Sequence, residues 1–299
     1  MREDMRLDAK VAVVTGSGRG LGRAYAHALA AAGAAVVVND IDAAAAEVVQ
    51  KEILDAGGRA AVLVGAVGTA DVADALVETA VREFGRLDVM CTNAGALRDR
   101  TLAKVTDDEF DLVVGSHLRG TFTCGRSALL RFREQGTGGR LILVGSPAGQ
   151  LGDFGQTAYA AAKAAIIGLV RVWSVECAKV GVTVNAVVPM ALTRMAATIP
   201  SLAETVAAVE AGEPVPAAMR RSGLGTVDDV APLVVFLASD AAAEVTGQYL
   251  GAGGDRLSIW GHPREVFSAN REGGWTAESI ADAFPQVFTP HLQRHKVAR

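Results

Sequence analysis

The sequence predicts an α/β fold, in which a mostly parallel, doubly wound sheet carries helices on both faces and is followed by a C-terminal extension. Short β-branched runs alternate with Ala-, Leu- and Glu-rich segments of helical length through the first half of the chain. A glycine-rich turn follows the first of these runs. Half of the 299 residues are hydrophobic and 21% are charged, as in a folded globule with a large core.

The order of these segments gives the topology. Strands buried on both faces of a parallel sheet have continuous apolar sequences, and right-handed crossovers join them. The expected strands are residues 11–15, 35–39, 60–64, 87–92, 140–145, 182–188 and 248–251. The expected helices are residues 21–32, 43–55, 70–84, 107–133 (one helix or two), 158–180 and 226–239. Thr226 and Asp229 weakly match a capping box at the start of the last helix.

Two segments depart from this alternation. Residues 190–222 contain three prolines without clear strand character, and we expect a mobile helical insert beside the substrate. Residues 1–254 would then form one domain, and residues 255–299 an extension with a short helix at 277–284. The extension is rich in aromatic residues, namely Trp260, Phe267, Trp275, Phe284 and Phe288. It could pack on the domain, pack on a neighbouring subunit, or cover the substrate as a lid.

Composition argues against several classes of protein. A formal net charge of -4 without a basic stripe disfavours nucleic-acid binding. The cysteines Cys91, Cys124 and Cys177 have neither metal-ligand nor CxxC spacing, which indicates reduced thiols and no metal site. The polar N-terminus and the lack of an apolar run of about 18 residues predict no signal peptide and no membrane span. These observations favour a cytoplasmic location.

The turn after the first strand is typical of a dinucleotide site. A strand, a glycine turn and a helix bring backbone N–H groups and the positive end of a helix dipole against a pyrophosphate. Glycine is required where a side chain would block the phosphate. The candidate cofactor-binding residues here are Gly16, Ser17, Arg19, Gly20, Leu21 and Gly22. The sheet is therefore predicted to be of the Rossmann type.

The end of the second strand bears on the choice of cofactor. Asp40 occupies the expected position of a carboxylate that binds the adenosine ribose hydroxyls, where it would repel a 2′-phosphate. This predicts NAD rather than NADP, unless Asp40 only caps the next helix. Arg19 argues in the opposite direction, because a cation in the glycine turn could contact a 2′-phosphate. Asp40 carries more weight, since Ile41 and Asp42 add no second cation.

A catalytic group follows from the spacing of three residues. Tyr159 and Lys163 lie four residues apart on a predicted helix, which places both side chains on one face. A nearby ammonium and a cationic nicotinamide ring would lower the phenol's pKa from its usual value of about 10. Ser146 follows a predicted strand, where its hydroxyl could hydrogen-bond a substrate carbonyl or alkoxide.

With these motifs, residues 10 to about 254 resemble the short-chain dehydrogenase/reductases. Residues 15–22 match the cofactor motif of that family, and residues 92–95 match its NNAG turn except at Thr92. Ser146, Tyr159 and Lys163 match the catalytic triad, and residues 245–248 match the segment near the final strand.

The resemblance implies a role for each matched residue. Tyr159 would be the acid/base, Ser146 would orient the substrate oxygen, and Lys163 would bind the nicotinamide ribose and tune Tyr159. Tyr159 and Lys163 would thus also contact the cofactor. The remaining cofactor contacts implied by the resemblance are Asn93, Ala94, Gly95, Pro189 and Thr193. A homo-oligomer, either a dimer or a tetramer built on the long helices, is also implied.

The fourth active residue of the family departs from the pattern. Where the family usually has an Asn, this chain has His117, which could hold a water that links Lys163 to solvent or could only fill space. A closer similarity, which includes this His, is to the hydroxyacyl-CoA dehydrogenase domain of peroxisomal multifunctional enzymes. In the loop after the NNAG-like turn, Arg98 and Arg100 could form structural ion pairs or contact an acyl-CoA.

Three functions remain in competition. The first is NAD-dependent interconversion of a secondary alcohol and a ketone, on a hydroxyacyl-CoA, a steroid or another lipid-like small molecule. The second is NAD(P)-dependent reduction of a different hydrophobic ketone. The third is a non-catalytic NAD-binding regulator, which the intact Ser146, Tyr159 and Lys163 disfavour.

Overall fold

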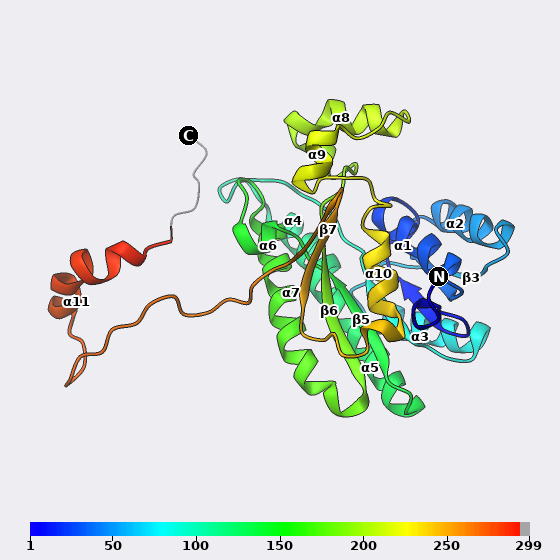
Figure 1. The fold of residues 1–299 in the computed structure, drawn as a ribbon, viewed down its shortest axis with the longest axis horizontal. Helices are drawn as coiled ribbons and strands as arrows, with labels where there is room; N and C mark the ends of the chain where they lie inside the picture. The colour runs from blue at the N-terminus through cyan, green and yellow to red at the C-terminus, as the bar shows by residue number, and fades with distance from the viewer. Residues whose placement is uncertain (294–299) are drawn as a thin grey trace. The chain divides into compact units, whose positions relative to one another are not determined.

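The computed structural model describes residues 1–293 and confirms the predicted fold class (Figure 1). Its eight-stranded sheet has the order β3-β2-β1-β4-β5-β6-β7-β8. The strands are β1 (Val11–Val14), β2 (Ala35–Asp40), β3 (Arg59–Val64), β4 (Val89–Thr92), β5 (Gly139–Val144), β6 (Val182–Pro189), β7 (Tyr249–Gly253) and β8 (Arg256–Ile259). All neighbouring strands are parallel except β7 and β8, which are antiparallel. The strand order reverses between β1 and β4, where ligands bind in doubly wound sheets.

Helices cover both faces of the sheet. The α-helices of the described residues are α1 (Gly20–Ala31), α2 (Ala43–Asp55), α3 (Ala70–Phe84), α4 (Asp107–Val114), α5 (Gly120–Gln135), α6 (Ala148–Leu151), α7 (Thr157–Glu176), α8 (Pro200–Glu210), α9 (Ala217–Ser222), α10 (Ala231–Ala238) and α11 (Ala277–Ala283), of which α8 and α9 lie in the insert and α11 in the extension. Residues of α1, α2 and α10 share one buried apolar cluster, and residues of α3, α5 and α7 share the other. Alternate residues of each strand supply both clusters, because strand side chains point to opposite faces.

The segment expected at residues 107–133 is two helices joined by a wide turn. Thr106 and Glu109 form a capping box at the start of α4. A π-helical turn, Gly115–Arg119, then separates α4 from α5. Such turns insert an extra residue into a helix and frequently occur at functional sites. This one contains His117.

The last helix and the last strands differ from the sequence expectation. The backbone N–H of Thr226 donates to Asp229 at 2.7 Å, but this pair closes a turn, and α10 begins only at Ala231. Asp229 also accepts two hydrogen bonds from Arg220, at 3.0 and 2.9 Å, which holds it outside the helix. β8, which lies beyond the expected domain boundary at residue 254, was not predicted because its residues are mostly exposed and lack an apolar run.

The chain divides into two compact units, Met1–Trp260 and Gly261–Arg299. The first ends later than residue 254 because β8 pairs with β7. In the second, the ring of Phe288 lies 5.5 Å from Phe267, 6.0 Å from Trp275 and 5.6 Å from Phe284. Four of the five aromatic residues expected in the extension therefore pack with one another, whereas Trp260 packs against the core cluster of the first unit. Whether the extension also covers a substrate or a neighbouring subunit stays a prediction.

Within residues 1–293, one helix, α7, is long and apolar enough to cross a membrane by length and composition, with a mean hydropathy of 1.4. Core helices of soluble proteins pass the same test. The buried face of α7 belongs to the core cluster that it shares with β5 and β6. Burial against the sheet thus accounts for the apolar character of that face.

Candidate active site

The glycine turn after β1 is closely packed against the turn after β4. Gly16 has a φ of +61°, and a Cβ there would lie 2.7 Å from the Cα of Ala94. A Cβ on Gly22 would lie 2.2 Å from the carbonyl oxygen of Gly16. Both positions therefore require glycine, for the approach of backbone to backbone. Ser17 is completely buried, and its hydroxyl donates to Val14 O at 2.8 Å. That hydroxyl also accepts the N–H of Asn39 at 3.1 Å, and the backbone N–H of Ser17 donates to Asn39 O at 2.7 Å, so Ser17 joins β1 to β2 and its contact with a cofactor stays a prediction.

The N-terminus of α1 fits a pyrophosphate. No side chain of the described residues caps this end of the helix, so its first N–H groups are open to an anion. Gly20 has a φ of +55°, and a Cβ there would meet nothing within 4 Å. The chain thus presents unpaired donors beside open space, as the dinucleotide site requires. Leu21 is only partly buried and packs its side chain against the core.

Asp40 is tied to the glycine turn by its carboxylate. Its Oδ2 accepts the backbone N–H of Gly18 at 2.9 Å, and its Oδ1 accepts that of Asp42 at 3.1 Å. Asp40 does not cap α2, since Asp42 occupies that position and accepts the N–H of Ala45. The open alternative that Asp40 only caps a helix is therefore excluded. The guanidinium of Arg19 forms an ion pair with Asp42.

The turn after β4 is held to the end of β1. The side-chain amide of Asn93 donates to the carbonyl oxygens of Thr15 and Gly16, both at 3.0 Å. The hydroxyl of Thr15 accepts the backbone N–H groups of Asn93 and Ala94, also at 3.0 Å. These four hydrogen bonds join the two strands at the point where the strand order reverses.

The three triad residues come together between β5 and α7. Ser146 follows β5, is buried, and its hydroxyl accepts the N–H of Ala148 at 3.1 Å. The ammonium nitrogen of Lys163 lies 5.7 Å from the centre of the Tyr159 ring and donates to Val144 O at 2.6 Å. The spacing of four residues on α7 thus places both side chains on one face, toward the end of β5.

Burial dominates the proton affinities of this pair. It raises the pKa of Tyr159 above its ordinary value, although a hydrogen bond with Ser146 opposes the rise. The lowering of the Tyr159 pKa that the sequence analysis expects from an ammonium and a bound nicotinamide must therefore overcome this burial, and it stays a prediction. Burial lowers the pKa of Lys163 to about 7. A lysine that is half neutral near pH 7 gives the phenol less electrostatic help than a fixed cation would.

His117 lies against the triad and is almost completely buried. Its ring centre is 5.1 Å from that of Tyr159, edge to face, and its Nε2 lies 2.9 Å from the carbonyl oxygen of Ala96. Since a carbonyl only accepts, Nε2 carries the proton and Nδ1 is an acceptor. Nδ1 is buried without a partner among the described residues. Burial, with Lys163 nearby, lowers the pKa of His117 to about 3, so the ring is neutral.

Gly95 accommodates the His117 ring. A Cβ on Gly95 would lie 1.8 Å from Cε1 of His117. This contact gives Gly95 a steric role that the sequence did not indicate. The ring and the cofactor turn therefore constrain each other.

Two further residues that were predicted to contact the cofactor lie at the end of β6 and at the start of the insert. Pro189 ends β6, and the hydroxyl of Thr193 accepts the N–H of Ala196 at 3.2 Å. Their contacts with a nicotinamide stay predictions. The insert itself is helical, with a small apolar cluster of Leu192, Val206 and Val215.

The loop after the NNAG-like turn contains a residue that the sequence analysis missed. Asp99 has a buried carboxylate oxygen without a partner in the described part of the chain, and its charge contributes to the raised pKa of Tyr159. The sequence indicated Arg98 and Arg100 as candidate residues of this loop. No motif or spacing marked Asp99. Arg100 lies 3.5 Å from Glu109, which is an ion pair within the chain, and Arg98 donates to Leu97 O at 2.7 Å.

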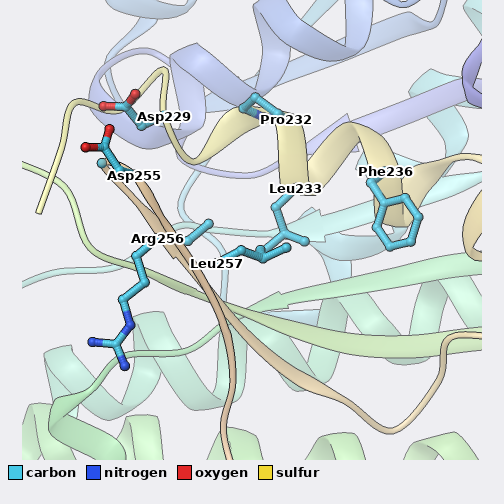
Figure 2. Close-up of a pocket in the computed structure, with 9 residues that line it drawn as sticks. Asp229, Pro232, Leu233, Phe236, Asp255, Arg256 and Leu257 are labelled. Carbon is cyan, nitrogen blue, oxygen red and sulfur yellow. The ribbon is translucent and has the colours of Figure 1, made fainter. Parts of the chain in front are cut away.

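A separate hollow lies between α10 and the β7–β8 hairpin (Figure 2). Apolar side chains of Leu233, Phe236 and Leu257 line it, with Asp229 and Asp255 at one end. None of the triad residues lines this hollow. Residues 1–293 also contain no cluster of His, Cys, Asp and Glu that could hold a metal. The three cysteines are free and buried, as expected.

Fold and site together define a dinucleotide-binding oxidoreductase of the Tyr/Lys type. The family model for short chain dehydrogenase matches residues 10–202, and the chain belongs to that family. It is 35% identical to the peroxisomal multifunctional enzyme type 2 of Mus musculus over 297 residues, which cover 96% of this chain and 38% of that protein. It is 39% identical to the hydroxyacyl-CoA dehydrogenase ChsB1 of Mycobacterium tuberculosis, over 88% of this chain and 84% of that one.

Solved structures give the same result. A short chain dehydrogenase from Mycobacterium avium superposes with a TM-score of 0.80 at 34% identity, over 93% of this chain and 94% of that chain. The chain spans no more than 38% of the length of the multifunctional relatives. The similarity to those proteins therefore concerns one part of each of them. The predicted family is confirmed, and so is the predicted similarity to the peroxisomal multifunctional enzymes.

Proposed function

We propose that the protein is an NAD-dependent dehydrogenase that interconverts a secondary alcohol and a ketone on a hydroxyacyl-CoA, a steroid or another lipid-like substrate. The observation that carries the proposal is the assembly of Ser146, Tyr159 and Lys163 next to the turn that fits a dinucleotide. The Ser146 hydroxyl lies close enough to Tyr159 to oppose the rise in its pKa, so we expect one substrate oxygen to contact both hydroxyls.

The residues of the site have different roles in proton transfer. In alcohol oxidation, Tyr159 takes the proton from the substrate hydroxyl while Ser146 holds the oxygen in place. Lys163 favours the phenolate by its charge and binds the nicotinamide ribose, and neutral His117 offers Nδ1 to a water beside the pair. Bound NAD supplies the hydride acceptor. Turnover therefore depends on Tyr159 more than on any other single side chain.

The preference for NAD rests on Asp40. Its carboxylate lies at the end of β2 with both oxygens fixed by backbone donors, and their remaining lone pairs are suited to ribose hydroxyls. A 2′-phosphate at the same place would meet its negative charge. Titration of the protein with each nucleotide, followed by the nicotinamide fluorescence of the reduced forms, tests this preference directly.

The substrate class rests on similarity and on the loop at residues 96–100. The relatives named above include a hydroxyacyl-CoA dehydrogenase and a multifunctional enzyme of peroxisomes. Arg98 has no acidic partner among the described residues, which leaves its charge for a substrate phosphate. Arg100, paired with Glu109, fits the structural alternative better.

Two further proposals concern assembly and location. Exposed apolar side chains gather on three helices: Phe110 and Leu112 on α4, Phe122 and Leu130 on α5, Val172 and Val175 on α7. We propose that these helices form a homo-oligomer interface, to be tested by light scattering. A cytoplasmic location remains part of the proposal and is tested by cell fractionation.

The decisive experiment measures NADH formation with a panel of hydroxyacyl-CoA thioesters, hydroxysteroids and simple secondary alcohols. We expect turnover of one class by the wild type and a loss of roughly a thousandfold or more in Tyr159→Phe, because the acid/base is removed. The variant should still bind NADH. Equal turnover by the two proteins would refute the mechanism, and NADH binding without turnover of any compound would favour a non-catalytic regulator.

A further inference from the structure

We propose that Asp42 is a second determinant of cofactor choice, acting by neutralising Arg19, so that the one cation of the glycine turn does not bind a 2′-phosphate. The inference rests on the proposed use of NAD. It concerns a residue that the sequence analysis did not assign to the site.

The starting observation is the position of Arg19. It is the last residue before α1 and lies in the turn that fits the pyrophosphate. Its side chain is about half exposed and would otherwise be free to contact an anion near the adenosine ribose. Instead, its guanidinium is bonded to Oδ2 of Asp42.

Asp42 is fixed in place by two further hydrogen bonds. Its Oδ1 accepts the N–H of Ala45 at 3.2 Å and so caps α2. Its own N–H donates to Asp40, which in turn accepts the N–H of Gly18. The cap and the pairing with Arg19 both hold the pKa of Asp42 below its usual range. An exposed ion pair normally contributes little, because two long side chains lose freedom when they pair. Here the carboxylate is already ordered.

The charges around the ribose site then favour a dinucleotide without the extra phosphate. Asp40 and Asp42 place two carboxylates beside the turn, and residues 40–47 contain no Lys or Arg. The next cation on α1, Arg23, is bonded to both carboxylate oxygens of Glu52, at 3.0 and 2.8 Å. A 2′-phosphate would therefore have to break one of these ion pairs to find a cation.

The substitution Asp42→Asn tests this role with little risk to the fold, because Asn caps helices about as well as Asp does. The dissociation constants for NADH and NADPH are measured by nicotinamide fluorescence. We expect the variant to shift the ratio of the two constants toward NADPH by about fivefold. The matched control is Asp55→Asn, which removes an exposed carboxylate paired with Lys51 at the other end of α2. The control should leave the ratio unchanged.

A second background shows whether Arg19 mediates the effect. In Arg19→Gln, the further change Asp42→Asn should shift the ratio by less than twofold, because no cation remains to be released. An equal fivefold shift in both backgrounds would overturn the proposed neutralisation and leave direct repulsion by Asp42. If the wild type binds NADH and Asp42→Asn leaves the ratio unchanged, this inference fails alone. If the wild type binds neither nucleotide, the proposed function fails with it.

Discussion

Replacing Lys163 by methionine should make the protein more stable, and the gain should depend on pH. Lys163 is 4% exposed, and burial lowers its pKa from 10.5 to about 7. One step in pKa corresponds to about 1.4 kcal/mol. Burying the charged lysine therefore costs up to about 5 kcal/mol of unfolding free energy below pH 7.

The sign follows from where the proton is bound. Between about pH 7 and 10.5 the unfolded chain holds a proton on Lys163 that the folded protein has released, so the stability contributed by this site rises with pH. Methionine has a similar shape and does not titrate. The advantage of Lys163→Met should thus be largest at pH 6 and should fall by about 4 kcal/mol at pH 10. The lost hydrogen bond to Val144 lowers the advantage equally at each pH.

Urea unfolding at pH 6, 8 and 10, followed by tryptophan fluorescence, gives the difference in unfolding free energy between wild type and variant. Titrating groups that Lys163 does not affect cancel in that difference. His117, whose pKa Lys163 helps to lower from 6.5, contributes at pH 6, so the comparison of pH 8 with pH 10 is free of it. Lys51→Met is the matched control, since the Lys51 side chain is 73% exposed and its replacement relieves no burial of charge. A difference for Lys163→Met that is the same at all three pH values would refute the reasoning. It would mean that the folded protein solvates the charged ammonium.

Two further predictions concern the ring that lies under the cofactor turn. Gly95→Ala should lower the unfolding free energy by about 2 kcal/mol or more in thermal unfolding, because the new Cβ overlaps His117. The control Gly115→Ala should leave the unfolding free energy unchanged, because its Cβ meets open space. Equal losses of unfolding free energy in the two variants would contradict the contact between Gly95 and His117. His117→Asn should resist acid better than the wild type. In the wild type, burial lowers the pKa of His117 from 6.5 to about 3, so the unfolding free energy falls as the pH drops from 6.5 toward 3. Urea titrations should show about 3 kcal/mol of this effect at pH 4, and parallel acid curves would refute it.

The sequence determined the features that depend on local spacing. The β-branched runs predicted the parallel strands β1 to β6 within a few residues, because strands buried on both faces need continuous apolar sequence. The spacing of Tyr159 and Lys163 predicted one face of α7, since residues four apart on a helix are neighbours. The glycine turn predicted the close approach of backbone at Gly16, where a side chain has no room.

Tertiary structure decided which distant residues meet. The sequence did not decide whether the charge of Arg19 is available to a 2′-phosphate. Only the folded arrangement of β1 and β2 brings Arg19 to Asp42. The sequence also did not decide whether His117 holds a water or only fills space. The fold packs its ring against Gly95, where the ring is neutral and Nδ1 can accept a hydrogen bond. The raised pKa of Tyr159 also comes from burial by segments far apart in the chain. Spacing along a helix or strand fixes direction, whereas desolvation and pairing depend on every segment that packs around a group.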